Sequence, residues 1–247
     1  MQRQPIRRLK PSARAAPVGA ARAEMVEGPT SWPLTVPAVA QIATQGLDLP
    51  PGATILMGEN GAGKSTVIEV LAAVLGLNPE GGSAGTRHRT RASEPGHLDL
   101  VVERSPGAPR WAYYLRDETL HGLYTYLEEH PSPRPEPRFH QLSHGEAFLQ
   151  ILAARASTGG FYLMDEPDAA LSFQGSLSLV ALLSDLVATG AQTVIATHSP
   201  IVAALPDAHL LEIGPRGLRT TTWEQLDITT NWREFLRDPQ SYLRHPS

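Results

Sequence analysis

Residues 58–65 constrain the fold of this 247-residue chain more than any other feature. They read GENGAGKS, which fits the pattern G-x-x-x-x-G-K-S/T, and they follow a short apolar run at residues 53–57. Apolar side chains then recur at helical spacing up to Gly76. Glycines let such a loop turn its backbone N–H groups inward, and a helix start adds partial positive charge. The pattern therefore predicts a strand, an anion-binding loop and a helix in succession.

The phosphate loop, residues 58–66, predicts specific contacts with a nucleotide. We expect Lys64 to neutralise β- and γ-phosphate oxygens and the Ser65 hydroxyl to bind Mg²⁺. The only other lysine of the chain is Lys10, so a chance lysine at this position has little weight. The expected nucleotide contacts are Gly58, Glu59, Asn60, Gly61, Ala62, Gly63, Lys64, Ser65 and Thr66.

Two acidic residues end a second apolar run. Residues 161–164 are all apolar, which is typical of a strand buried on both faces, and Asp165 and Glu166 follow at once. Carboxylates in such a place are costly to desolvate unless they are paired or bound to a metal. Beside a phosphate loop, we expect Asp165 to reach Mg²⁺ and Glu166 to orient and deprotonate the attacking water. A merely solvated strand end is the alternative.

A histidine ends the third apolar run, residues 193–196. A lone histidine is usually structural. Here the strand should end at the same sheet edge as the Asp-Glu strand, where the His198 imidazole would hydrogen-bond the γ-phosphate and the water. The predicted catalytic residues are therefore Glu166, His198 and Lys64, and the predicted metal ligands are Ser65 and Asp165.

Strand and helix patterns alternate, which predicts an α/β fold with a mostly parallel sheet covered by helices on both faces. Strands at 97–103 and 111–115 are expected to form a hairpin through Pro106-Gly107, and strands at 209–213 and 218–222 a second hairpin. The other expected elements are an edge strand at 6–10 and helices at 119–129, 146–156, 176–188 and 231–236.

Composition and charge exclude several protein classes. The net charge of −4 argues against an overall basic nucleic-acid binder. The absence of cysteine excludes disulfides, a thiol nucleophile and cysteine-ligated zinc. No apolar run approaches the roughly 18 residues of a spanning helix, so we expect a cytoplasmic protein without direct membrane insertion. We expect an N-terminal strand and flexible basic arm at 1–31 and one domain at 32–247, with a Pro-rich insertion at about 130–138.

A fourth motif, LSHGE at residues 142–146, opens a predicted helix with a capping box between Ser143 and Glu146. The order GENGAGKST, LSHGE, FYLMDEP and ATH resembles the P-loop ATPases of the ATP-binding cassette (ABC) class. LSHGE is similar to their LSGGQ signature and closer to the LSGGE form of RecF and structural-maintenance-of-chromosomes proteins. More narrowly, the chain resembles small stand-alone bacterial ATPases of that branch, which share GLNPEGGS, SHGE, ATHSPI and a segment like DEPDAALS.

The resemblance implies ATP and Mg²⁺ as ligands and ATP hydrolysis as the activity. It also implies an antiparallel β lobe and a small helical lobe that carries the signature. Two copies would form a homodimer, head to tail around ATP, with Ser143 and Gly145 of one copy contacting the γ-phosphate held by Lys64 of the other. A further protein partner stays open.

The chain also departs from the family pattern. His144 replaces a glycine, and Ser172 stands where transporters often have aspartate. No clear Q-loop glutamine follows a strand, and residues 116–118 (Arg-Asp-Glu) are the nearest substitute. No aromatic platform for adenine is identifiable, and Trp32 is a guess.

Three functions stay open. The first is a soluble ATPase that dimerises around ATP. The second is the nucleotide-binding subunit of an ABC transporter, against which stand the short span from Lys64 to Ser143 and the missing Q-loop. The third is a RecF-like DNA repair or defence ATPase. Against this third function stand the negative net charge and the expectation that no nuclease domain follows, although the basic loop at 87–91 leaves a nucleic-acid contact open.

Overall fold

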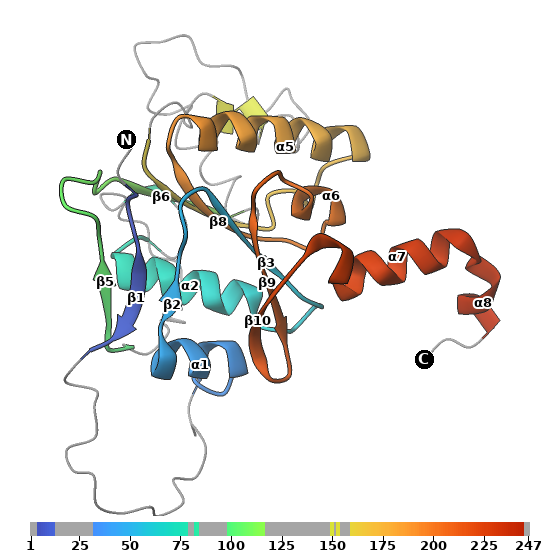
Figure 1. Cartoon of the computed structure of the whole chain (residues 1–247), viewed down its shortest axis with the longest axis horizontal. Coiled ribbons are helices and arrows are strands. Elements are labelled where there is room, and N and C mark those ends of the chain that lie inside the picture. Colours follow the sequence, from blue (N-terminus) through green and yellow to red (C-terminus); the bar gives the residue numbers. More distant parts are fainter. Residues whose placement is uncertain are drawn as a thin grey trace, which may run out of the picture.

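A seven-stranded sheet forms the centre of the protein in a computed structural model that describes residues 4–12, 32–78, 82–83, 98–116, 149–150, 152–153 and 159–244. Its strand order is β10-β9-β3-β8-β7-β6-β4, and a second, three-stranded sheet has the order β2-β1-β5 (Figure 1). The expected α/β fold with a mostly parallel sheet and a small antiparallel sheet is thereby confirmed. The strands of the large sheet are β3 (Ala53–Met57), β4 (Gly82–Ser83), β6 (Ala112–Arg116), β7 (Phe161–Asp165), β8 (Gln192–Ala196), β9 (His209–Gly214) and β10 (Gly217–Thr221).

The five inner strands of the large sheet run parallel. β6 pairs with β7, β7 with β8, β8 with β3 and β3 with β9, all in parallel register, while β4 and β10 pair antiparallel at the two edges. Parallel strands place their carboxyl ends at one edge of a sheet, which is where open α/β sheets bind ligands. The residues that follow β3, β7, β8 and β9 therefore gather at that edge.

The small sheet consists of β1 (Arg8–Pro11), β2 (Leu47–Asp48) and β5 (Leu100–Glu103). β1 is its central strand, antiparallel to both neighbours. The strand predicted at 6–10 is therefore present, largely at the expected residues, but its predicted place at a sheet edge was wrong. The buried amide of Gln192 on β8 ties the segment before β1 to the core, because it accepts from the N–H of Ile6 and donates to the carbonyl of Ile6, at 2.9 and 2.7 Å.

The hairpin predicted between the strands at 97–103 and 111–115 was also wrong. β5 pairs with β1 in the small sheet, whereas β6 pairs with β7 and β4 in the large one. The physical reason is burial: four of the five residues of β6 are buried, as a strand inside a covered parallel sheet requires, whereas every residue of β5 is at least partly exposed.

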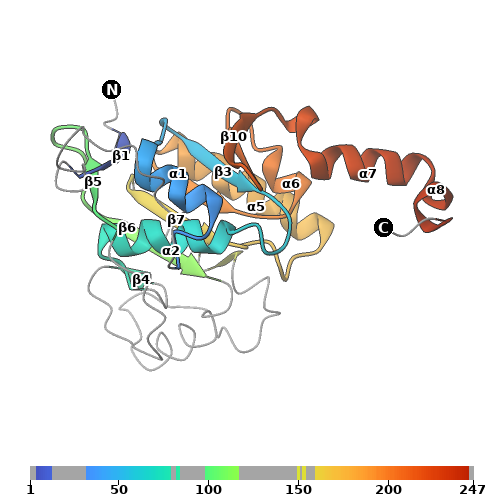
Figure 2. The same ribbon diagram turned by 90° about the horizontal axis from the view of Figure 1, so that it is seen from below.

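Helices cover both faces of the large sheet. α5 (Phe173–Ala188) lies on one face, and α1 (Pro37–Gln45) and α2 (Lys64–Leu75) lie on the other (Figures 1 and 2). Successive side chains of β3 point to opposite faces, so Ile55 belongs to the core cluster that contains Leu183 of α5, and Leu56 belongs to the cluster that contains Leu71 of α2.

Local capping explains where these helices begin and end. The Ser172 hydroxyl accepts from the N–H of Gly175 at 3.1 Å, so the serine that replaces the transporter aspartate caps α5. Gly76 ends α2 in the left-handed conformation, with φ of +69°. None of the helices in the described part of the chain combines the length and apolarity that a membrane crossing needs.

The chain ends in helices that extend from the carboxyl edge of the sheet. α6 (Pro200–Ala203) follows β8, and after β10 come the 3-10 helix η3 (Trp223–Gln225), α7 (Asp227–Arg237) and α8 (Pro239–Arg244). α7 projects away from the sheet and ends in α8 (Figure 1). Of the expected helix at 146–156, only 149–150 and 152–153 are described, and they are helical. The expected helix at 119–129, the Pro-rich insertion and the basic loop lie outside the described residues.

Candidate functional site

The phosphate loop joins β3 to α2 and packs against the residue that precedes α1. Gly63 has a φ of +102°, a left-handed conformation that side chains rarely adopt. A Cβ at this position would also overlap Cγ1 of Val36, the N-cap residue of α1. The backbone conformation and the closeness of Val36 therefore both require glycine directly before Lys64. Val36 packs against the loop at this point.

Lys64 is the first residue of α2, and its side chain folds back into the loop. Its Nζ donates to the carbonyl oxygens of Gly58 and Glu59 at 3.1 and 3.2 Å, and it lies 2.7 Å from Nε2 of His198. Burial lowers the pKa of Lys64, and nearby carboxylates, Glu166 first among them, oppose that shift. The ammonium group is thus held inside the loop that is predicted to surround an anion.

Ser65 and Asp165 meet across the sheet edge, where the Ser65 hydroxyl donates to Oδ1 of Asp165 at 3.1 Å. Asp165 ends β7, which lies two strands from β3 and not directly beside it, since β8 separates them. Burial raises the pKa of Asp165 to about 6, against the opposing effects of the Ser65 hydrogen bond and the Arg116 charge. The structure thereby brings the two predicted metal ligands together.

The chemistry of this pair fits Mg²⁺. Magnesium prefers oxygen ligands and is usually held by one or two protein groups together with substrate phosphates. Ser65 and Asp165 offer a hydroxyl and a carboxylate beside the phosphate loop. Across the described ranges, no group of three or more His, Cys, Asp or Glu side chains could hold a metal ion by itself. The residues present therefore suit an ion that arrives with a nucleotide.

Glu166 and His198 also lie together, as the positions after two neighbouring strands predict. Oε1 of Glu166 is 3.1 Å from Nε2 of His198. Glu166 has a φ of +49°, and its N–H donates to the carbonyl of Ala196 at the end of β8. A non-glycine residue in this conformation costs roughly 1–3 kcal/mol, so the neighbouring strand holds Glu166 in place. Its role as the base stays a prediction.

A second contact between the same two turns was missed by the sequence analysis. The hydroxyl of Thr197 donates to Oδ1 of Asp168 at 2.5 Å and accepts from the N–H of Ser199 at 2.9 Å. Burial raises the pKa of Asp168, although the Thr197 hydrogen bond opposes that shift. The contact fixes the turn after β7 to the turn after β8 and so positions Glu166 and His198. The sequence did offer a sign of this contact, because residues 165–168 (DEPD) and 196–199 (ATHS) each lie at the end of a buried strand.

Arg116 is the described part of the Q-loop substitute. It ends β6 opposite Asp165 in the parallel register with β7, and its Nη1 lies 3.0 Å from Oε1 of Glu69 on α2. Its charge favours the ionised form of Asp165. Residues 117 and 118, together with Ser143 and Gly145 of the signature, lie outside the described residues, so their roles stay predictions.

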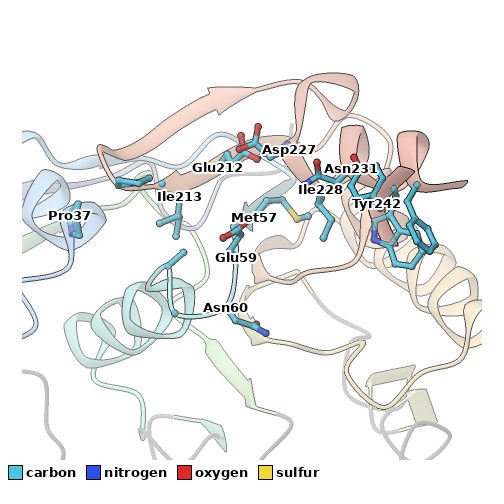
Figure 3. A pocket seen from close by; sticks show the side chains of 17 residues that line it. Pro37, Met57, Glu59, Asn60, Glu212, Ile213, Asp227, Ile228, Asn231 and Tyr242 are labelled. Carbon is cyan, nitrogen blue, oxygen red and sulfur yellow. Dashed lines mark hydrogen bonds between the residues drawn. The ribbon is translucent and has the colours of Figure 1, made fainter. Parts of the chain in front are cut away.

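A cavity of about 880 Å³ opens on the other side of the phosphate loop, away from Glu166 and His198. It lies between the loop, the end of β9 and the helices α7 and α8 (Figure 3). No pattern in the sequence predicted this cavity. Trp32, the guess for an adenine platform, is exposed and is not one of the residues that line it.

Comparison with known proteins places this geometry in a family context. A model of the ABC transporter family matches residues 44–169, a range that includes the phosphate loop, Asp165 and Glu166. The cytochrome c biogenesis ATP-binding export protein CcmA of Roseobacter denitrificans (strain ATCC 33942 / OCh 114) is 31% identical over 174 residues, which cover 68% of this chain and 81% of that protein.

Two further matches are more distant. CcmA of Rhodopseudomonas palustris (strain HaA2) is 29% identical over 167 residues, 60% of this chain and 79% of that protein. Among solved structures, cbiO1 from Clostridium perfringens, part of the ABC transporter complex cbiONQ, aligns with a TM-score of 0.47 and 15% identity, over 80% of this chain and 89% of that one.

Proposed function

Because this chain belongs to the ABC transporter family and is an ATP-binding, ATP-hydrolysing enzyme, we propose that hydrolysis takes place between two copies arranged head to tail. The observation that carries the proposal is the gathering of Lys64, the Ser65–Asp165 pair and the Glu166–His198 pair at one sheet edge. Phosphoryl transfer needs little beyond positioning and charge stabilisation, and these groups supply both.

Each group has a distinct role in the proposed reaction. Lys64 neutralises charge on the β- and γ-phosphate oxygens, and the loop N–H groups hold the phosphates in place. Ser65 and Asp165 hold Mg²⁺, which supplies further charge neutralisation when bound. Glu166 orients the attacking water and takes its proton, and His198 contacts the γ-phosphate.

In this proposal, the second copy supplies additional contacts to the γ-phosphate. The signature residues Ser143 and Gly145 begin a predicted helix, and a helix start offers unpaired N–H groups to an anion. In the head-to-tail dimer, these groups contact the γ-phosphate held by the partner's loop. Hydrolysis removes the γ-phosphate that joins the two copies, so the dimer opens and the two copies move relative to each other.

The relatives favour a transporter subunit over a stand-alone ATPase as the setting of this activity. The matched proteins from Roseobacter and Rhodopseudomonas are named ATP-binding export proteins. If the chain serves a permease, the tagged protein should sediment with membranes and be released at alkaline pH without detergent. A stand-alone ATPase would stay in the supernatant at every pH.

Glu166→Gln tests the proposed chemistry. The amide keeps the size of the side chain and an acceptor oxygen but cannot take a proton, so hydrolysis should slow by roughly 10²–10⁴-fold. Phosphate contacts remain, so an ATP-bound dimer should accumulate in size-exclusion chromatography with Mg-ATP. Glu224→Gln on η3 makes the same change on an exposed residue and is the matched control.

Each outcome of this experiment has a separate meaning. Wild-type phosphate release by Glu166→Gln would show that Glu166 is not the base and would make His198 the leading candidate. Loss of hydrolysis without dimerisation would reject the head-to-tail arrangement and leave the assignment of Glu166 standing.

A further inference from the structure

We propose that the cavity beside the phosphate loop receives the nucleoside part of ATP, and that aromatic rings of α7 and α8 form the platform for its base. The inference rests on ATP binding at the phosphate loop, as proposed above. It replaces Trp32, the guess from sequence, with residues from the far end of the chain.

The order of strands determines the direction in which the nucleotide lies. Along the carboxyl edge, Glu166 follows β7, His198 follows β8 and the phosphate loop follows β3. The γ-phosphate belongs at the Glu166–His198 end, where the attacking water must be activated. A triphosphate is a linear chain, so the nucleoside leaves the loop on the opposite side, toward the end of β9. The cavity opens at that place.

The cavity begins at the phosphate loop itself. Met57, Glu59 and Asn60 line one side of it, and Ile213 and the start of the β9–β10 turn continue that wall. Figure 3 shows Met57 and Glu59 on one side, with Ile228, Asn231 and Tyr242 on the other. Its volume of about 880 Å³ lies within the range of roughly 300–1,000 Å³ that is usual for small-molecule sites.

Three aromatic side chains on the helical side are held in a fixed arrangement. Trp232 and Phe235 of α7 meet edge to face with ring centroids 6.2 Å apart, and Phe235 meets Tyr242 of α8 in the same way at 6.0 Å. The Tyr242 hydroxyl donates to Oε2 of Glu234 at 2.8 Å. Every nucleobase has a π-face that stacks on such rings. Trp232 is still 49% exposed, which leaves ring surface open to a base.

A buried carboxylate fixes the two walls of the cavity relative to each other. Oε1 of Glu212, near the end of β9, accepts from the N–H of Asp227 at 2.9 Å, and Asp227 is the first residue of α7. Arg219 of β10 pairs with the same Glu212 carboxylate. α7 therefore begins at a defined place beside β9, so the cavity is shaped before a ligand arrives.

Trp232→Ala separates base binding from phosphate binding. Calorimetry with Mg-ATP and with Mg-tripolyphosphate, which has no base, gives both affinities. The variant should raise the Kd for ATP about 5- to 100-fold, because it removes one stacking contact, and should leave tripolyphosphate binding unchanged. Phe235→Ala should act in the same direction, and Trp232→Phe, which keeps a ring, should recover most of the affinity for ATP.

Two matched variants serve as controls. Trp32→Ala removes the other candidate ring, and Leu236→Ala truncates a side chain of α7 that is 70% exposed and does not line the cavity. Both should bind ATP as the wild type does. The proposal is overturned if Trp232→Ala and Phe235→Ala leave the Kd for ATP unchanged, or if Trp32→Ala raises it instead.

Lys64→Ala tells the failure of this proposal from the failure of the proposed function. That variant should lose both ligands, because the lysine neutralises the phosphates. If it loses both while Trp232→Ala changes neither, the phosphate site stands and the base lies elsewhere. If Lys64→Ala binds both ligands normally, the phosphate site itself is wrong.

Discussion

Asp165→Asn should stabilise the nucleotide-free protein and at the same time abolish Mg-dependent ATP hydrolysis. Asp165 is only 5% exposed, and burial raises its pKa from 3.8 to about 6. A carboxyl whose pKa rises on folding binds protons more tightly in the native state. It therefore lowers the free energy of unfolding as the pH rises from the unfolded pKa through the folded one. Asparagine keeps the size and an acceptor oxygen for Ser65 but carries no charge.

The magnitude of the gain follows from the shift. A pKa raised from 3.8 to about 6 corresponds to about 3 kcal/mol at pH 8, at about 1.4 kcal/mol for each pKa unit. The new amide NH₂ needs a partner, which reduces the expected gain to about 1–3 kcal/mol. For a chain of this length, each kcal/mol raises Tm by roughly 2–4 °C. At pH 5 most native molecules carry a protonated Asp165, so the gain should fall to about half.

Urea unfolding with EDTA and without nucleotide, at pH 8 and pH 5, measures this difference. Asp185→Asn, which removes an exposed carboxylate on α5, is the matched control and should change stability by less than about 0.5 kcal/mol. Phosphate release with Mg-ATP measures the loss of activity. If Asp165→Asn is less stable than the wild type at pH 8, then Arg116 and Ser65 stabilise the carboxylate by more than burial costs, and the reasoning fails.

Two further substitutions probe parts of the site that the first does not reach. Ser143→Arg should leave ATP binding by the monomer intact but block ATP-induced dimerisation in light scattering, and normal dimerisation would show that Ser143 does not act across the dimer. Gly63→Ala should lower the free energy of unfolding by about 1–3 kcal/mol, because the backbone is left-handed and the new methyl group overlaps Val36. The double variant with Val36→Ala should recover the part that is due to overlap, and full stability of Gly63→Ala in urea would contradict both causes.

Local patterns predicted the strands that position the candidate site. An apolar run ends directly before the glycine-rich phosphate loop, and two further runs end directly before Asp165 and before Thr197-His198. A parallel strand that is buried on both faces needs apolar residues at nearly every position, so it is recognisable in the sequence. The spatial meeting of Ser65 with Asp165 then follows, because the carboxyl ends of parallel strands share one edge.

The missed features depend on contacts between distant segments. No expectation covered α1 (Pro37–Gln45), which packs against β1 and β10, and these contacts stabilise a helix that local signals hardly mark. The cavity was not predicted for the same reason. Its walls come from β3, β9, α7 and α8, and no pattern within one segment indicates that these elements face each other.

His198 lies between Lys64 of the phosphate loop and Glu166, the predicted catalytic base. Its Nε2 lies 2.7 Å from Nζ of Lys64 and 3.1 Å from Oε1 of Glu166. One ring nitrogen cannot accept from an ammonium group and donate to a carboxylate at the same time, so only one of these two contacts is favourable in any protonation state. In the proposed reaction, a γ-phosphate oxygen that accepted from Lys64 would compete with this contact to the ring. Nε2 would then be free to donate to Glu166, so the proposed reaction predicts that a bound triphosphate favours the Glu166–His198 contact over the Lys64–His198 contact.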